Sequence, residues 1–198
     1  MFLKHSYTLF APLYDYVIEP ATRSARRESI ARLASAEPRN VLISGVGTGL
    51  DLPLLPRQHR YVGLDLTAAM LAKIRTRRLE LDFREVRGDA QRLPFKDGVF
   101  DAALLHLILA VVPRPALCLA ETARVVRPGG EVMVFDKFLR PNQRAPLRRA
   151  LSPIMSRVAT RLDVILEDVL ATVPELETLA DVPILAGGWF RLIRLRRV

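Results

Sequence analysis

The chain has 198 residues, of which 50% are hydrophobic and 26% charged, enough for one domain with a full core. The one cysteine, Cys118, excludes an intramolecular disulfide and fits a reducing cytoplasm, so we expect a cytoplasmic protein. One cysteine and three scattered histidines predict no metal site, and no apolar run reaches the roughly 18 residues of a membrane-spanning helix.

The formal net charge of +9 favours polyanionic partners, namely nucleic acid, an anionic membrane surface or acidic substrates. Much of this charge lies in residues 137–161, which contain no acidic residue. The basic residues of this segment are Lys137, Arg140, Arg144, Arg148, Arg149, Arg157 and Arg161. The run fits a solvated helix face as well as it fits a binding surface.

The N-terminal part is predicted to be helical. Met1 to Pro20 carries Asp15 and Glu19 and lacks a basic start before a continuous apolar core, so we do not interpret it as a signal peptide. The arginine-rich stretch from Ala21 to Ala36 predicts a second helix before the first strand.

Strand-like and helix-like segments alternate after residue 40. Short apolar runs, typical of a parallel sheet buried on both faces, predict strands at Asn40–Ser44, Arg60–Leu64, Leu81–Arg87, Phe100–Leu105 and Glu131–Phe135. Helices are predicted at Thr67–Arg77, with Thr67 as N-cap, and at Pro115–Val126. Pro128-Gly129-Gly130 is predicted to end the second helix and turn the chain into the next strand.

The last third changes character. Arg144 to Val173 predicts one or two helices with an apolar stripe, and Asp181 to Val198 predicts a β-hairpin that turns at Gly187-Gly188. Together these patterns predict an α/β fold: a Rossmann-like, seven-stranded, doubly wound sheet with a terminal antiparallel hairpin and helices on both faces.

The segment from Val41 to Asp51 is the most informative part of the sequence. An apolar strand runs into glycine at every second position, and Asp65 follows twenty residues after Gly45. Glycines let the backbone approach a nucleoside-bearing ligand closely, while a carboxylate at the end of the next strand can bind ribose hydroxyls. A nicotinamide-dependent dehydrogenase is disfavoured because Leu50 stands where a third glycine should be.

Four blocks in order make the chain resemble the class I S-adenosylmethionine-dependent methyltransferases, of the type 11 group, over about residues 40–137. The blocks are Gly45–Gly49, Val62–Leu71, Gly88–Asp101 and Arg124–Val132. We therefore expect one domain over residues 1–198, with an N-terminal helical cover (1–38), a cofactor-binding core (39–137) and a basic helical segment with the hairpin (138–198).

The resemblance implies S-adenosylmethionine as cofactor, S-adenosylhomocysteine as product, and no metal. The positions that it implies for cofactor contact are Gly45, Val46, Gly47, Asp65, Leu66, Met70, Asp89, Ala90 and His106. The glycine turn would pack under the methionine and ribose, and Asp65 would hold the ribose hydroxyls. Asp89 and the Ala90 N–H would bind the adenine edge, and His106 would lie beside the sulfonium.

Two features qualify these roles. Asp65 and Asp89 could instead cap the turns that follow them. The family usually has an acid two residues before the first glycine, where this chain has Ile43, so that cofactor affinity is reduced or another acid such as Asp51 substitutes.

Methyl transfer needs an aligned nucleophile and the exclusion of water, and a base only if the nucleophile arrives protonated. The catalytic candidates are His106 at the end of the fourth strand, Asp136 after the fifth, and Tyr14 in the N-terminal cover. The alternatives are a structural histidine, a surface pair of Asp136 with Lys137, and a packing aromatic.

The substrate is suggested by the segments outside the core. Tyr7–Asp15 resembles the start of the bacterial phosphatidylethanolamine N-methyltransferases and of the quinone-ring C-methyltransferases. Gly45–Pro53 and Val111–Pro115 are more similar to the phospholipid group, although that group usually has Asn-His where this chain has Asp136-Lys137. We therefore expect a lipid or other amphiphilic acceptor and an enzyme peripheral to the anionic inner membrane surface.

Three alternatives stay open. The acceptor could be a quinone precursor or a soluble small molecule, or the chain could be a cofactor-free scaffold with a degenerate fold. A nucleic-acid methyltransferase is suggested only by the charge, because the sequence has no Asp-Pro-Pro-Tyr-type tetrapeptide, and we expect no specific nucleic-acid partner.

Overall fold

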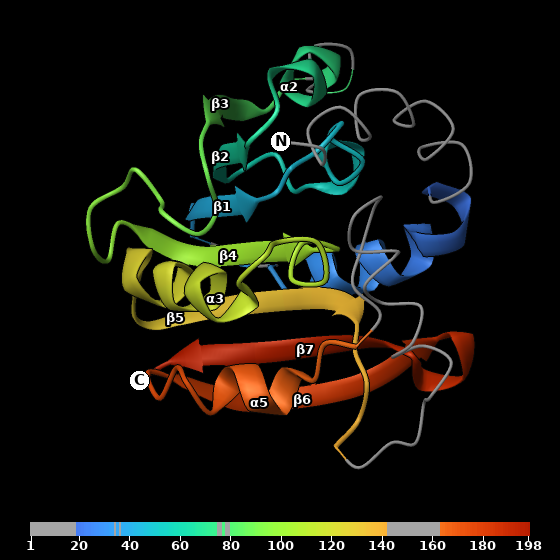
Figure 1. The fold of residues 1–198 in the computed structure, drawn as a ribbon. Coiled ribbons are helices and arrows are strands. Elements are labelled where there is room, and N and C mark those ends of the chain that lie inside the picture. The colour runs from blue at the N-terminus through green and yellow to red at the C-terminus, as the bar shows by residue number, and fades with distance from the viewer. Residues whose placement is uncertain (1–18, 34, 36, 75–76, 78–79, 142–162) are drawn as a thin grey trace.

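The computed structural model describes residues 19–33, 35, 37–74, 77, 80–141 and 163–198. Within these residues the chain forms a seven-stranded sheet in the order β3-β2-β1-β4-β5-β7-β6 (Figure 1). The strands are β1 (Asn40–Ser44), β2 (Arg60–Asp65), β3 (Asp82–Arg87), β4 (Phe100–His106), β5 (Val126–Lys137), β6 (Leu176–Leu185) and β7 (Phe190–Arg197). The first five pair in parallel, and β7 runs antiparallel to both β5 and β6. The predicted doubly wound sheet with a terminal hairpin is confirmed.

Two strand boundaries were predicted wrongly: β6 begins at Leu176, five residues before the predicted start of the hairpin at Asp181, and β5 also begins earlier than expected. We expected Pro128-Gly129-Gly130 to separate a helix from a strand beginning at Glu131, but β5 begins at Val126, directly after the helix. Val126 already pairs with Phe100, and the register shifts before Ala102 pairs with Glu131. The Pro-Gly-Gly segment therefore forms an irregularity within the strand, where proline lacks the N–H that a regular ladder uses.

The helices of the described residues lie within or close to the predicted ranges. Residues 19–31 are helical, followed by α2 (Ala68–Ile74), α3 (Pro115–Val125) and α5 (Leu166–Leu170), with 3-10 turns η1 (Leu52–Leu54) and η2 (Ala186–Gly188). The predicted helix within residues 1–20 and most of the one predicted for residues 144–173 lie outside the described residues. No helix of the described part is long and apolar enough to span a bilayer.

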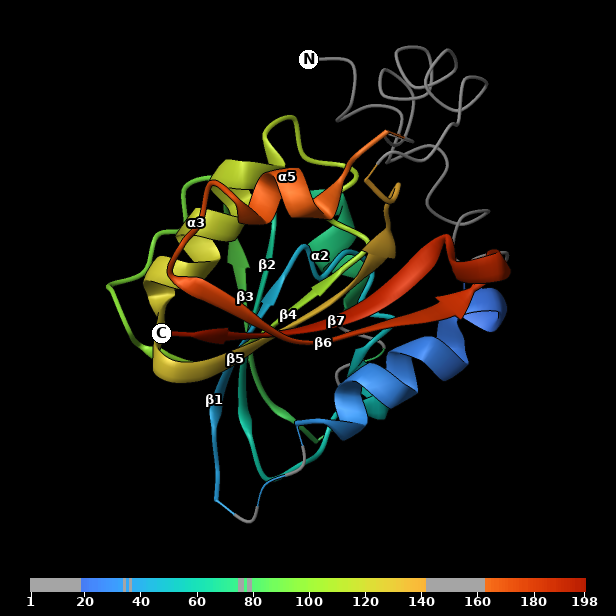
Figure 2. The same cartoon turned by 90° about the horizontal axis from the view of Figure 1, so that it is seen from below.

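Both faces of the sheet are covered by helices (Figure 2). Alternate residues of the central strands face opposite ways, so Leu42 and Leu105 pack in the cluster that holds α3 and α5. Ile43 and Leu104 pack in the other cluster, with α2 and the helix of residues 19–31. This alternation, period two along each strand, is what buries both faces.

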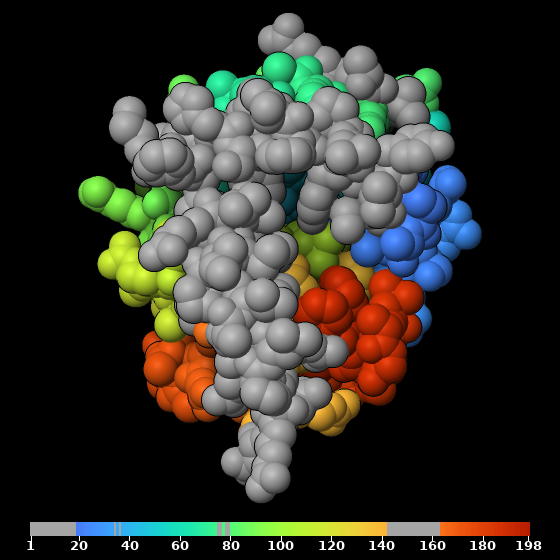
Figure 3. All heavy atoms as spheres, turned by 45° about the vertical axis from the view of Figure 1, so that its right-hand side comes forward, coloured from blue at the N-terminus to red at the C-terminus, as the bar shows by residue number. Residues whose placement is uncertain are grey.

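The hairpin and the N-terminal helix meet at one end of the sheet. Ala25, Phe135 and Leu192 form a third apolar cluster, against which Leu107 and Phe190 pack while only partly buried. Figure 3 shows the hairpin, in red, and the helix of residues 19–31, in blue, on the same face of the molecule. We call this group of five residues the hairpin cluster.

A buried arginine ties α5 to the hairpin. The guanidinium of Arg191 donates to Glu167 at 2.7 Å and to Asp181, and it lies 5.9 Å from the centre of the Phe138 ring. Because Arg191 sits on β7, the contacts fix α5 relative to the sheet.

Candidate functional site

A pocket of about 350 Å³ opens at the carboxyl ends of β1, β2 and β4. The strand order reverses between β1 and β4, and ligands of open α/β sheets bind at such a switch point. The residues that line the pocket include all nine positions implied for cofactor contact: Gly45, Val46, Gly47, Asp65, Leu66, Met70, Asp89, Ala90 and His106. The fold thus gathers residues of the first three sequence blocks, together with His106, around one cavity.

The glycine turn after β1 forms the floor of the pocket. Gly45 and Gly47 have φ of +72° and +57°, values that L side chains rarely adopt. A Cβ on Gly45 would lie 2.4 Å from Cδ1 of Ile108, whereas the nearest atom to a Cβ on Gly47 would be 4.0 Å away. Packing therefore requires the first glycine, while the second leaves open space at the edge of the cavity.

Asp65 joins two loops at the middle of the pocket. Its Oδ2 accepts from the Gly47 N–H at 3.0 Å, and its Oδ1 accepts from the Thr67 N–H at 2.8 Å. Burial raises the pKa of Asp65, although the backbone N–H groups partly offset that rise. The carboxylate does cap the following turn, but each oxygen retains capacity for a second donor, such as a ribose hydroxyl.

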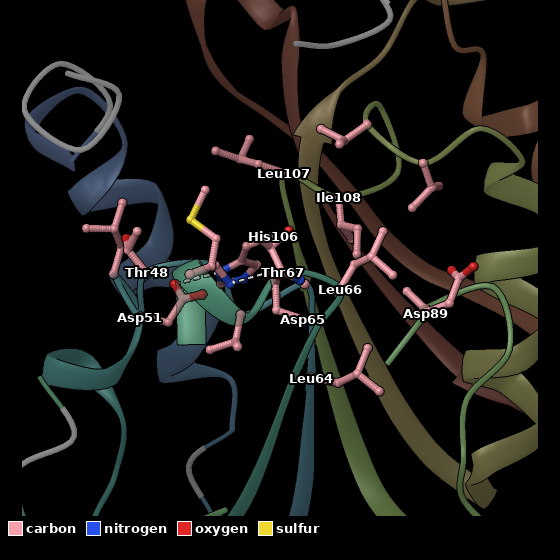
Figure 4. Close-up of a pocket in the computed structure, with 18 of the residues that line it drawn as sticks. Thr48, Asp51, Leu64, Asp65, Leu66, Thr67, Asp89, His106, Leu107 and Ile108 are labelled. Carbon is pink, nitrogen blue, oxygen red and sulfur yellow. Dashed lines mark hydrogen bonds and ion pairs between the residues drawn. The ribbon is translucent and has the colours of Figure 1, made fainter. Parts of the chain in front are cut away.

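Asp89 marks another end of the cavity. Its Oδ1 accepts from the backbone N–H of Gln91 at 2.9 Å and from the Gln91 side chain at 3.1 Å, so the capping interpretation is again correct in part. Figure 4 shows Asp51 and Asp89 toward opposite ends of the pocket, with Asp65 between them. Three carboxylates thus follow one another along an elongated cavity.

His106 is held rigidly by both ring nitrogens. Its Nδ1 lies 2.8 Å from Oδ1 of Asp51, and its Nε2 lies 2.9 Å from Oγ of Ser29. The ring also packs edge-on against Phe135, with 5.8 Å between ring centres. An imidazole fixed in this way is oriented, and its nitrogens are already occupied.

Arg26 completes this buried cluster. Its guanidinium donates to Asp51 at 2.8 Å and to the Thr22 hydroxyl at 3.0 Å. Burial alone would raise the pKa of Asp51, but the charges and hydrogen bonds of Arg26 and His106 outweigh it and hold that pKa well below the usual range. Asp51 is therefore ionised at neutral pH.

The order Ser29–His106–Asp51 resembles the hydrogen-bond chain of a hydrolytic triad. Ser29, however, is 0% exposed and does not line the pocket, so no substrate carbonyl can reach its hydroxyl. The chain serves to fix His106 and Asp51 at the cavity wall.

Asp136 lies behind the pocket. Its side chain is fully buried, is not among the residues that line the cavity, and accepts from the backbone N–H groups of Ala110 at 2.9 Å and Lys137 at 2.8 Å. Burial raises its pKa, against the lowering effects of Lys137 and the backbone donors. The alternative of a surface pair with Lys137 is wrong, because Asp136 holds the segment that lines the pocket from Leu107 to Pro113. Tyr14 lies outside the described residues.

Sequence reasoning missed Arg26 altogether and gave Asp51 little weight. Both line the pocket, although 25 residues separate them in the chain. The one available signal was an acid inside the glycine-turn segment. Within the described part of the chain, no group of three His, Cys, Asp or Glu residues could hold a metal ion.

Fold and pocket together define a methyltransferase domain of the α/β class. The family described as "Methyltransferase domain" matches residues 42–134. A phosphatidylethanolamine N-methyltransferase of Cereibacter sphaeroides is 34% identical over 200 residues, which cover 98% of this chain and 97% of the relative. The chain therefore belongs to the methyltransferase family, and it is an S-adenosylmethionine-dependent methyltransferase, as the resemblance implied.

Two further proteins show the breadth of this similarity. A demethylmenaquinone methyltransferase of Mycolicibacterium vanbaalenii is 37% identical over 176 residues, covering 84% of this chain and 74% of the relative. The crystal structure of geranyl diphosphate C-methyltransferase from Streptomyces coelicolor A3(2), with Mg²⁺, geranyl diphosphate and S-adenosyl-L-homocysteine, superposes with a TM-score of 0.72 at 18% identity. That match covers 89% of this chain and 79% of the other.

Proposed function

We propose that this methyltransferase acts on an amphiphilic acceptor, with the amine of a phospholipid as the first candidate. The relative from Cereibacter sphaeroides, similar over nearly the whole of both chains, supports a phosphatidylethanolamine-like acceptor. The observation that carries the proposal is Leu107, which lines the pocket and also belongs to the hairpin cluster. An apolar tail would lie along these partly buried side chains while the headgroup enters the pocket.

The pocket fits the cofactor. Its volume of about 350 Å³ falls in the range of small-ligand sites, and the absent side chain of Gly47 leaves room at its edge. We assign Asp65 to the ribose hydroxyls and Asp89, with the Ala90 N–H, to the adenine edge. The exposed Leu66 and the buried Met70 would pack against the adenine.

When bound, S-adenosylmethionine supplies an activated methyl group. The chain contributes orientation and the exclusion of water, and the apolar side chains of Ile108, Val111 and Val112 on the pocket wall suit the second task. His106 is fixed at both ring nitrogens, so we assign it a positioning role beside the acceptor and not that of a free base. Asp136 would act through the wall segment that it holds, and Tyr14 stays a candidate for the acceptor side.

The test is labelled-methyl transfer from S-adenosylmethionine to phosphatidylethanolamine in mixed micelles, with a demethylated quinone and free ethanolamine as competing acceptors. We expect label in the phospholipid, and none in any acceptor for Asp65→Ala. Asp82→Asn is the matched control, because it removes an exposed carboxylate on β3 outside the pocket. Label only in the quinone would favour the second group of relatives, and label only in ethanolamine would contradict an amphiphilic acceptor.

We further propose that the enzyme works in the cytoplasm, at an anionic membrane surface. The net charge of +9 supports this, because each basic residue near such a surface contributes about 1 kcal/mol. Five of the seven basic residues in 137–161 lie outside the described residues; Lys137 and Arg140 lie within them. Sedimentation with vesicles at moderate salt tests the proposal: equal partition onto anionic and neutral vesicles would contradict it.

A further inference from the structure

We propose that Arg26 and Asp51 form the subsite for the zwitterionic amino-acid end of the cofactor. Asp51 would thus supply the carboxylate that the chain lacks at position 43. The inference rests on the proposed placement of the cofactor and extends it to the end of the pocket that this placement leaves unassigned.

The first argument is the order of carboxylates along the cavity. Asp89 and Asp65 are assigned to the adenine and the ribose, and Asp51 lies at the opposite end from Asp89 (Figure 4). A ligand that extends from adenine through ribose to an amino acid therefore places its last part beside Asp51. The same wall carries Arg26, which also lines the pocket.

The second argument is charge. Arg26 and Asp51 are 6% and 3% exposed, and they pair at 2.8 Å, so this end of the pocket contains one buried charge of each sign. Asp51 makes its contacts with Arg26 and His106 through Oδ1 alone, and Oδ2 has no hydrogen-bond partner among the residues that the structure describes. A zwitterion adds one ammonium and one carboxylate, so binding leaves the net charge of the site unchanged.

The third argument is geometry of recognition. An ammonium near Oδ2 of Asp51 would form a charge-assisted hydrogen bond, and the planar guanidinium of Arg26 suits a carboxylate. Ile43 cannot take either part, because it is 1% exposed and packs in an apolar core cluster away from the pocket lining. The carboxylate that the family usually carries on the strand, at the position of Ile43, would thus be supplied by Asp51 in the loop after the glycine turn.

Comparison of two ligands by calorimetry separates this role from a structural one. S-Adenosylhomocysteine has the amino-acid end, whereas 5′-methylthioadenosine has the same adenosine and thioether but lacks that end. We expect Asp51→Asn to weaken S-adenosylhomocysteine about 10–100-fold, the range for a hydrogen bond to a charged group, and to leave methylthioadenosine within about twofold. Asp82→Asn should change neither affinity.

A double variant guards against misfolding. Asp51→Asn leaves Arg26 without its charged partner, so Arg26→Gln with Asp51→Asn removes both charges and keeps polar side chains at both positions. Its binding should show the same selective loss. Equal weakening of both ligands, or no weakening of either, would overturn the subsite. If the unaltered protein binds neither ligand, the proposed cofactor site itself is wrong.

Discussion

Replacing Gly45 by alanine should destabilise the fold more than the same change at a left-handed glycine with open space beside it. The new side chain would occupy φ of +72°, which costs an L residue about 1–2 kcal/mol. It would also lie 2.4 Å from Cδ1 and 3.0 Å from Cβ of Ile108, so the whole side chain must move, and such overpacking costs about 1–3 kcal/mol. The expected loss in the free energy of unfolding is about 2–5 kcal/mol.

Gly129 provides the matched control. It has φ of +78° and no atom within 4 Å of its added Cβ, so Gly129→Ala should cost only the backbone part, about 1–2 kcal/mol. Any effect of the extra Cβ on the unfolded chain is common to both variants and cancels in the difference.

Urea unfolding measures the comparison directly. With a slope of about 2 kcal/mol per molar urea, the midpoint should fall by roughly 1–2.5 M for Gly45→Ala and roughly 0.5–1 M for Gly129→Ala. Equal midpoints would refute the argument from Ile108. Gly47→Ala should resemble Gly129→Ala in stability but weaken S-adenosylhomocysteine at least tenfold, because its Cβ enters the open space at the pocket edge.

Three other features give measurable consequences. The pKa of Asp51 is lower in the folded chain than its ordinary 3.8, so ionisation of Asp51 stabilises the fold above pH 3.8. The difference in free energy of unfolding between the unaltered protein and Asp51→Asn should therefore shrink as the pH falls below 3.8. A difference that stays constant down to about pH 2 would contradict the lowered pKa. Burial raises the pKa of the Cys118 thiol to about 12, so iodoacetamide at pH 8 should label it only on unfolding, and rapid labelling of the native protein would show that α3 opens. Arg191→Met should lower the free energy of unfolding by about 1.5–3 kcal/mol, and we expect the lower end of that range because the Glu167 side chain is 39% exposed. The control Arg196→Met, at an exposed position of the same strand, should change the free energy of unfolding by less than about 0.5 kcal/mol. Equal losses for the two variants in a denaturant titration would contradict the role of Arg191 in holding α5.

The glycine turn and Asp65 could be predicted from the sequence because they follow local sequence patterns. The glycine turn and Asp65 obey rules that act over a few residues and one strand–helix–strand unit, and the structure places them together. The parallel strands were predicted for the same reason, because a continuous or alternating apolar run can be recognised without knowing which strands pair with it.

The buried cluster of Arg26, Asp51 and His106 could not be predicted, because its contacts join residues far apart in the sequence. Asp51 is separated from Arg26 by 25 positions and from His106 by 55, and nothing local to any of them specifies the cluster. Asp136 beside Lys137 suggested a surface pair, but the fold turns that carboxylate inward to the Ala110 N–H. Such contacts depend on the topology of the whole fold, and hydrophobic patterns restrict the possible topologies without specifying these contacts.

The position of β7 shapes how the polypeptide reaches this fold during synthesis. β5 can pair with β4 as soon as it leaves the ribosome, but its other edge stays open until β6 and β7 have been made. That edge borders residues 132–135, all apolar and fully buried in the finished sheet, and open edges of this kind template aggregation. β6 then becomes the outer strand, and its Pro183 and charged Glu177 discourage further pairing. The last hairpin therefore covers an apolar strand edge that could otherwise pair with a second copy of the chain.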